Sequence, residues 1–416
     1  MENECLRVEI DRETGNLSRV YDKINEREVL SGQGNQLQVF RDSGQYWDAW
    51  NIDPNYAEHL LPAPVVKEIK CLERGPIRWR SRVVRSLVKS ESELESESKS
   101  ESTSFVQDFV QDYILEAGSP VLKIATTVDW QERHIMVKAA FPLQEGADYA
   151  TYEMPCGAIE RSTKPQTAAE KAKWEVPALR WADISSPKSE DLTVSSPESS
   201  QESNQESSQE LNQELNQELK QPSNSGYGVS LLNDCKYGYD AQPHQLRLTL
   251  LRGSTWPDPE ADLGKHEFTY ALYPHAGNWR SAHTVRRGYE LNLPLRLLVG
   301  KTETKTQNQN RDIKNKVLAA SGSLLDLSAE NLVLMAFKRS EDDRDRWILR
   351  CYECCGGEAE LTLRGDLGLA IVEPVDLLEQ PAPTPEYLPE NKTYKISSWK
   401  VASFALVESD SEISVI

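Results

Sequence analysis

Apolar residues recur at every second position over most of this chain, and this period constrains the fold more than any other feature of the sequence. Within residues 121–130, the positions that would share one face of a strand are Leu122, Ile124, Val128 and Trp130. The opposite face would carry Lys123, Thr127 and Asp129. Residues 6–10 and 17–21 show the same alternation on either side of a DRETGN turn. The pattern predicts an all-β protein built from packed antiparallel sheets.

Two further local patterns refine this prediction. Residues 347–353 and 358–363 flank Gly356 and Gly357, which predicts a hairpin with a tight turn. Only residues 168–174 and part of 313–320 have the composition of helices, and both segments are short. We expect a large sandwich at residues 1–298, a linker at 299–320 and a smaller sandwich at 321–416.

The formal net charge of −19 comes mainly from two low-complexity segments. Residues 90–104 carry a net −4 and residues 187–224 a net −6, which leaves about −9 for the rest of the chain. Lys and Arg do not cluster, so neither a nucleic-acid partner nor an acidic membrane surface is expected. The folded part therefore has an ordinary charge balance.

The acidic segment at 187–224 contains a tetrapeptide array, QESN, QESS, QELN, QELN and QELK, from Gln201 to Lys220. A helix would place its Glu side chains four residues apart on one face, where like charges repel each other. We predict that this segment and the one at 90–104 are disordered loops. A transient helix that binds a partner is the alternative for the array.

The chain shows no signal for a membrane or for secretion. No stretch approaches the roughly 20 apolar residues of a membrane span, and the N-terminal MENECLRVEIDRETG lacks the apolar run of a signal peptide. Seven cysteines are an odd number, which favours free thiols in a reducing compartment. We therefore expect a cytoplasmic protein.

Four segments resemble one enzyme family, and they occur in the family's order: 46–53 (YWDAWNID), 152–183, 227–274 and 331–353. They resemble the C-terminal β-rich region of the α-mannosidases of glycoside hydrolase family 38. The resemblance implies a large galactose mutarotase-like β-supersandwich, followed by a smaller β-sandwich. It also implies retaining hydrolysis, with an aspartate nucleophile and a zinc ion in an N-terminal catalytic barrel. No residue here matches those barrel motifs, so no catalytic residue is carried over, and any zinc is expected in the barrel.

Residues 231–240, LLNDCKYGYD, combine hydrogen-bonding groups with two aromatic rings, the mixture that sugar recognition uses. The resemblance places this loop and residues 252–266 on the side that faces the barrel. In WDAWNID, Trp47 and Trp50 could form a sugar platform or pack in the core, and Asp48 is expected to make structural hydrogen bonds. The candidate substrate-binding or barrel-facing residues are Trp47, Asp48, Trp50, Asp234, Lys236, Tyr237, Tyr239, Arg252, Asp258 and His266.

The sequence offers little support for chemistry carried by this chain alone. Asp258 and Asp262 form an acidic pair in WPDPEAD, but turn capping explains them better than catalysis does. The six His show no metal-binding spacing, and Cys351, Cys354 and Cys355 lack a second pair, so no metal site is expected. No nucleotide-binding or serine-hydrolase motif is present.

The resemblance thus implies the C-terminal part of an α-mannosidase, an enzyme that removes terminal α-D-mannose residues in mannose and oligosaccharide catabolism. A separate or lost zinc-dependent barrel would complete it. The expected partners are an α-mannoside or oligosaccharide and either a barrel polypeptide or a second copy of the chain. A carbohydrate-binding β-protein without catalysis and the remnant of a split gene are the alternatives.

Overall fold

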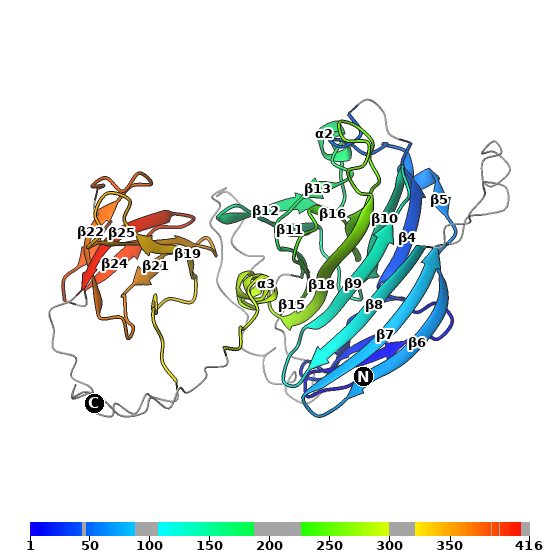
Figure 1. Cartoon of the computed structure of the whole chain (residues 1–416), viewed down its shortest axis with the longest axis horizontal. Helices are drawn as coiled ribbons and strands as arrows, with labels where there is room; N and C mark the ends of the chain where they lie inside the picture. Colours follow the sequence, from blue (N-terminus) through cyan, green and yellow to red (C-terminus); the bar gives the residue numbers. More distant parts are fainter. Residues whose placement is uncertain are drawn as a thin grey trace, which may run out of the picture. The chain divides into compact units, whose positions relative to one another are not determined.

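The computed structural model of this protein describes residues 1–43, 47–87, 107–186, 226–298, 321–383, 385–390 and 392–408 (Figure 1). The predicted loops at 90–104 and 187–224, the linker at 299–320 and the short helix within 313–320 lie outside these residues. Two compact units are formed, one by residues 1–153 with 159–293 and the other by 154–158 with 294–416. No helix in the described ranges is long and apolar enough to cross a membrane.

The largest sheet of the first unit has nine strands. In spatial order they are β12 (Gly157–Ser162), β11 (Tyr149–Met154), β14 (Trp181–Ser185), β15 (Tyr227–Asn233), β18 (Gly264–Ala276), β9 (Leu122–Trp130), β8 (Gln107–Glu116), β7 (Arg78–Leu87) and β6 (Val65–Arg74). The pairs from β11 to β6 are antiparallel. The alternation predicted for residues 121–130 is confirmed, because the predicted apolar face of β9 is buried.

Two smaller sheets complete the first unit. A six-stranded sheet has the order β13 (Val176–Pro177), β16 (Gly238–Gln242), β17 (Gln245–Leu251), β10 (Ile135–Pro142), β4 (Gln36–Arg41) and β5 (Leu60–Leu61). A three-stranded sheet contains β1 (Leu6–Ile10), β2 (Leu17–Asp22) and β3 (Arg27–Glu28). The predicted pair of N-terminal strands is therefore confirmed.

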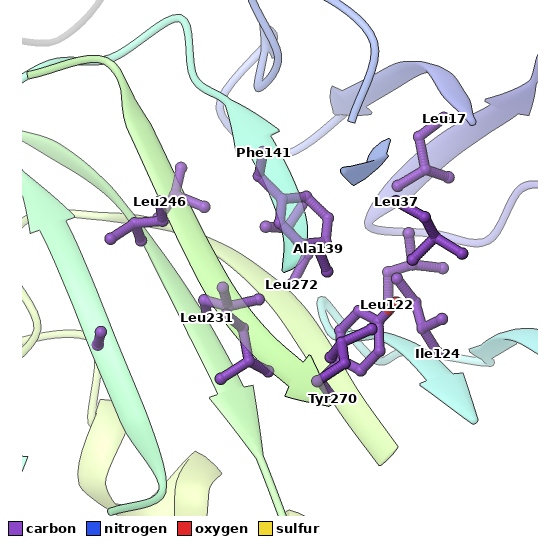
Figure 2. Packing of buried hydrophobic residues seen from close by; sticks show 14 of the residues in the cluster. Leu17, Leu37, Leu122, Ile124, Ala139, Phe141, Leu231, Leu246, Tyr270 and Leu272 are labelled. Carbon is purple, nitrogen blue, oxygen red and sulfur yellow. The ribbon is translucent and has the colours of Figure 1, made fainter. Parts of the chain in front are cut away.

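The main hydrophobic core takes side chains from all three sheets. Figure 2 shows Phe141 of β10 and Leu246 of β17 together with Leu231 of β15 and Tyr270 of β18. Every one of these four side chains is fully buried. Burial of apolar area on this scale is the main stabilising term for a sandwich.

Both acidic inserts connect neighbouring antiparallel strands. Leu87, the last residue of β7, pairs with Gln107, the first residue of β8. Ser185, the last residue of β14, pairs with Gly228 near the start of β15. The described residues on the two sides of each insert are therefore adjacent in the sheet.

Helices are few in the part of the chain that the structure describes. They are η1 (Tyr56–Glu58), α2 (Ala168–Lys171) and α3 (Thr284–Asn292). The sequence predicts α2, whose Thr167 and Glu170 cap each other's backbone N–H groups. It does not predict α3, which lies against β14 and β15. Gly288 allows this close approach, because a Cβ there would lie 3.2 Å from atoms of Arg180 and Trp181.

The second unit is a small sandwich with a core of its own. One sheet has the order β19 (Leu332–Arg339), β20 (Trp347–Glu353), β25 (Val401–Glu408) and β22 (Leu369–Val375). The other contains β21 (Ala359–Leu361), β24 (Thr393–Ile396) and β23 (Tyr387–Leu388). Leu349 and Phe404 of the first sheet and Leu361 of the second are fully buried in the shared core. The predicted all-β class, with a large and a smaller sandwich, is confirmed.

The hairpin predicted around Gly356 and Gly357 is wrong, because β20 and β21 lie in different sheets. The buried Glu353 at the end of β20 sets the direction of the chain instead. Its carboxylate accepts backbone N–H bonds from Cys355 at 2.7 Å, Gly356 at 2.8 Å and Trp399 at 3.0 Å. These bonds fix a crossing from one sheet to the other, which a two-glycine pattern alone does not reveal.

Candidate functional site

Three exposed tryptophans gather on the surface of the first unit. Trp47, Trp50 and Trp256 are 59%, 66% and 44% exposed. The ring centroid of Trp256 lies 4.3 Å from that of Trp47 and 5.1 Å from that of Trp50. The sequence left open whether Trp47 and Trp50 pack in the core, and the structure places both on the surface. We call these three residues the tryptophan cluster.

The side chain of Asp48 links the two loops that carry the tryptophan cluster. This residue is buried, and its carboxylate accepts backbone N–H bonds from Thr255 at 2.7 Å and Trp256 at 2.9 Å. Burial alone would raise the pKa of Asp48, but these N–H donors outweigh burial and lower that pKa below its ordinary value. Asp48 therefore makes the structural hydrogen bonds that the sequence predicts.

Arg252 makes a second connection between the same two loops. Its guanidinium pairs with the buried Asp42 at 2.6 Å and donates to the carbonyl of Asn51 at 3.0 Å. The backbone N–H groups of Arg252 and Gly253 both donate to Asp262, at 3.0 and 2.7 Å. Arg252 is therefore fixed within the protein, as a structural link between the loops.

The acidic pair of WPDPEAD caps turns. Asp262 binds the two N–H groups just described, and Asp258 accepts the N–H of Glu260 at 2.9 Å. His266 lies beside this loop, with Nε2 at 2.7 Å from the carbonyl oxygen of Asp262. Retaining glycosidases need two carboxyl groups about 5–5.5 Å apart that are free to act on substrate. Asp262 is bound to backbone N–H groups and does not meet this requirement.

Residues 234–237 form a second feature that is at least partly exposed. Asp234 accepts the N–H of Thr269 at 2.8 Å, while its other oxygen is buried with no hydrogen-bond partner among the described residues. The Lys236 ammonium lies 4.3 Å from the ring centroid of Phe268, and burial lowers the pKa of Lys236. Tyr237 is exposed and lines a pocket of about 270 Å³ together with Asp234. This pocket is small for an oligosaccharide.

Tyr239 does not belong to the exposed surface, although the sequence groups it with Tyr237. The residue is fully buried, and its hydroxyl accepts from Asn233 at 2.5 Å and donates to the carbonyl of Leu231 at 3.3 Å. The difference arises because Tyr239 lies within β16 and packs into the main core, whereas Tyr237 precedes the strand. A direct contact between Tyr239 and a sugar is therefore excluded in this structure.

The structure thus divides the ten candidates into groups. The first group lies at the two linked loops and consists of Trp47, Asp48, Trp50 and Arg252, together with Trp256. Asp258 lies on the loop of Trp256, and His266 lies directly after that loop. The second group lies on a neighbouring loop and consists of Asp234, Lys236 and Tyr237. There burial lowers the pKa of Lys236, and the negative charge of Asp262 partly opposes that change. The sequence missed Asp42 and Thr255 as partners, because neither carries a motif.

The described residues do not provide a metal site. Within those ranges no three His, Cys, Asp or Glu side chains converge closely enough to hold a metal ion. We therefore assign the zinc that the family resemblance implies to none of the described residues.

Comparison with known proteins agrees with the order of the two units. Residues 1–196 and 193–260 match the family described as "Glycosyl hydrolases family 38 C-terminal domain". Residues 331–404 match the "Glycosyl hydrolases family 38 C-terminal beta sandwich domain". Both matches therefore concern C-terminal domains of one enzyme family.

Individual relatives give the same picture. The chain is 30% identical to human alpha-mannosidase 2C1 over 418 aligned positions, which cover 98% of this chain and 33% of that protein. It is 28% identical to an alpha-mannosidase of Saccharomyces cerevisiae, covering 91% of this chain and 31% of the yeast protein. The chain spans about a third of the length of these relatives.

A solved structure supports the fold. The crystal structure of an alpha-mannosidase from Enterococcus faecalis superposes with a TM-score of 0.65 and 14% identity, and covers 97% of this chain and 42% of that one. The two family models cover most of the first unit and most of the second unit, respectively. The chain therefore belongs to glycosyl hydrolase family 38, as the C-terminal region of such a protein.

Proposed function

We propose that this chain is the C-terminal β-region of an α-mannosidase that removes terminal α-D-mannose residues together with a zinc-dependent catalytic barrel. In this proposal the barrel supplies the nucleophile and the metal. The chain described here supplies a rigid surface against which the barrel docks. The curated relatives are α-mannosidases about three times as long as this chain, which supports the proposal.

The tryptophan cluster is the observation that carries the proposal. Exposed apolar patches rimmed by polar residues mark interaction sites on proteins, and Trp is enriched at the centres of interfaces. The three ring planes are inclined to one another by 51–90°, so they do not form one flat surface on which a sugar ring could stack. This shape favours insertion into a partner protein over stacking on a sugar.

The rigidity of the cluster supports the same proposal. Asp48 and Arg252 tie its two loops to each other, so little side-chain and loop freedom is left to lose on binding. Rigid anchors of this kind strengthen an interface by reducing the entropic cost of association. The partner we propose is the barrel domain, either on the same polypeptide or on a separate one.

Co-expression tests the proposal. The chain would be produced alone and together with the polypeptide encoded directly upstream of Met1, joined in frame or separate. We expect no release of nitrophenol from nitrophenyl α-mannoside by the chain alone, and chelator-sensitive release by the combination. Activity of the chain alone, or a combination that neither co-elutes nor gains activity, would contradict the proposal.

A pair of variants tests the surface itself. Trp50→Ala combined with Trp256→Ala should weaken co-elution and activity together, while the fold stays intact by circular dichroism. Ile77→Ala is the matched control, because Ile77 is 79% exposed and lies outside the tryptophan cluster. Equal effects of the control and of the double variant would mean that the docking face lies elsewhere.

A further inference from the structure

A pocket of about 580 Å³ lies beside the six-stranded sheet of the first unit. Its walls come from β16 and β17, from β11 and β12, and from the segments that carry η1 and α2. None of the ten candidate residues from the sequence lines it. Ligand pockets in proteins usually measure about 300–1,000 Å³, so this one has the size of a site for a small ligand.

A fixed network of charges forms one wall of the pocket. Arg247 pairs with Asp240 at 2.6 Å and donates to the hydroxyl of Tyr56 at 2.8 Å. Beneath them the fully buried Lys138 pairs with Asp240 at 2.9 Å and also contacts Glu175. Because each of these groups is held by others, the wall does not need to reorganise when a ligand binds.

Arg161 is the polar group of the pocket that this network does not use. It lies on β12, and its Nε atom is buried without a hydrogen-bond partner among the described residues. A buried donor left unpaired costs free energy, which a ligand acceptor would recover. Tyr152 is buried and also lines the pocket. Burial raises the pKa of Tyr152, and the positive charge of Arg161 opposes that rise.

Aromatic side chains complete the site. Trp174 lines the pocket and packs against the small core cluster that contains Tyr56. The ring of Tyr152 is held edge to face against the ring of Tyr239, with centroids 6.4 Å apart. Fixed rings beside hydrogen-bonding groups suit a ligand that has apolar faces and polar edges.

The charges around the pocket have both signs, which limits the ligand further. The lining includes three acidic residues, Asp240, Glu160 and Glu170, and four basic residues, Arg161, Arg247, Lys171 and Lys173. A strongly anionic or cationic ligand would meet like charges, and an apolar ligand would leave Arg161 unsatisfied. A neutral ligand with many hydroxyl groups can donate hydrogen bonds to the acidic residues and accept them from the basic residues.

We propose that this pocket is a second carbohydrate-binding site, which takes a neutral oligosaccharide and is separate from the tryptophan cluster. Arg161 and Asp240 bind the sugar hydroxyls, while Trp174 contacts a ring face and the buried Tyr152 supports the wall of the pocket. The site would hold a glycan near the enzyme without taking part in bond cleavage. It does not depend on the barrel partner, so it can be tested on the chain alone.

Titration calorimetry and saturation-transfer NMR on the purified chain test the proposal, with a linear α-linked mannotriose, maltotriose and cellotriose as probes. At least one of these trisaccharides should bind. Arg161→Ala should weaken its binding by about tenfold or more, the effect of one lost hydrogen bond to a charged group. Trp174→Ala should act in the same direction, and Arg161→Lys should restore part of the affinity.

Two controls locate the site. Arg12→Ala removes an exposed arginine that does not line the pocket, and Trp256→Ala alters the tryptophan cluster, so neither should change the affinity. If Trp174→Ala does not fold, Trp174→Leu replaces it, because that change keeps an apolar side chain against the small core cluster but removes the aromatic ring. The proposal is overturned if no trisaccharide binds, or if Trp256→Ala abolishes binding while Arg161→Ala leaves it intact.

Discussion

The carboxylate of Asp48 accepts the backbone N–H of Trp256 at 2.9 Å, across 208 residues of sequence. The two residues belong to different loops, and this bond together with that from Thr255 fixes one loop against the other. The exposed indole of Trp256 is thus held in place by a buried acid.

Removal of that acid should loosen the tryptophan cluster. Asp48→Ala leaves the N–H groups of Thr255 and Trp256 without their acceptor, so we expect a loss of about 1–3 kcal/mol in the free energy of unfolding. Urea denaturation measures the loss, and limited proteolysis should show earlier cleavage near residue 256. The control is Asp53→Ala on the same loop, whose carboxylate accepts the exposed N–H of Asn55. Equal losses for both variants would refute the special role of Asp48.

The stability of the first unit should depend on pH through Asp112. Burial would raise the pKa of Asp112, but hydrogen bonds from Arg82 and Arg80 outweigh it and lower that pKa. A lowered pKa contributes stability that is present above the unfolded value, about 4, and that is lost as the pH falls through the folded value. The difference in unfolding free energy between wild type and Asp112→Asn should therefore be full at neutral pH and shrink below about pH 4. A difference that stays constant down to pH 2 would contradict this assignment.

Lys138 should be among the most sensitive positions in the chain. Its ammonium is fully buried and pairs with Asp240 and Glu175, so Lys138→Met removes the cation that these two carboxylates share, while Asp240 keeps its pair with Arg247. We expect the free energy of unfolding to fall by about 3–5 kcal/mol, the usual cost of removing one partner of a buried ion pair. Lys164→Met is the control, because Lys164 pairs with Asp148 in an exposed position and should change little. Thermal unfolding followed by circular dichroism compares the two variants.

Glu353 should control the stability of the second unit. Glu353→Gln keeps the size of the side chain but places an amide N–H group against backbone N–H donors, so a loss of about 1–3 kcal/mol is expected. Glu360→Gln provides the control, since Glu360 is exposed on β21. A fluorescence-detected urea titration of both variants would reveal the difference, and an unchanged midpoint for Glu353→Gln would contradict it.

The insert at 187–224 should be dispensable for folding. Because Ser185 pairs with Gly228, a short Gly-Ser linker can join β14 to β15 without moving either strand. Loop closure changes by only about 0.6 kcal/mol for each halving of the loop length. The shortened protein should keep a cooperative unfolding transition in calorimetry, and the loss of that transition would show that the insert is part of the fold.

The sequence predicts the fold class well because period-two alternation is a local property. Leu122 and Ile124 are two residues apart, and the face they share is buried as expected. The alternation says nothing about which sheet a strand joins, and the wrong hairpin at Gly356 and Gly357 follows from this. There a glutamate, bonded to backbone up to 46 residues away, decides the path of the chain.

The candidate site is predicted less completely for a similar reason. Trp47 and Tyr237 are exposed, as residues of an interaction surface should be, but Tyr239 is buried although the same short motif contains it. The pocket that Arg161 lines is formed by segments that are far apart in the sequence and carry no common motif. Only the folded structure brings the residues of such a pocket together.

The pairing of Ser185 with Gly228 also means that the covalent connection between β14 and β15 can be replaced by the sheet itself. A fragment that ends after β14 would present an open strand edge, and a fragment that begins before β15 would supply the strand that fits it. Five residue pairs, from Trp181 with Leu232 to Ser185 with Gly228, define the register in which the two fragments would meet. A cut within the insert would therefore leave two strand pairings to re-form in the largest sheet, β14 with β15 and β18 with β9.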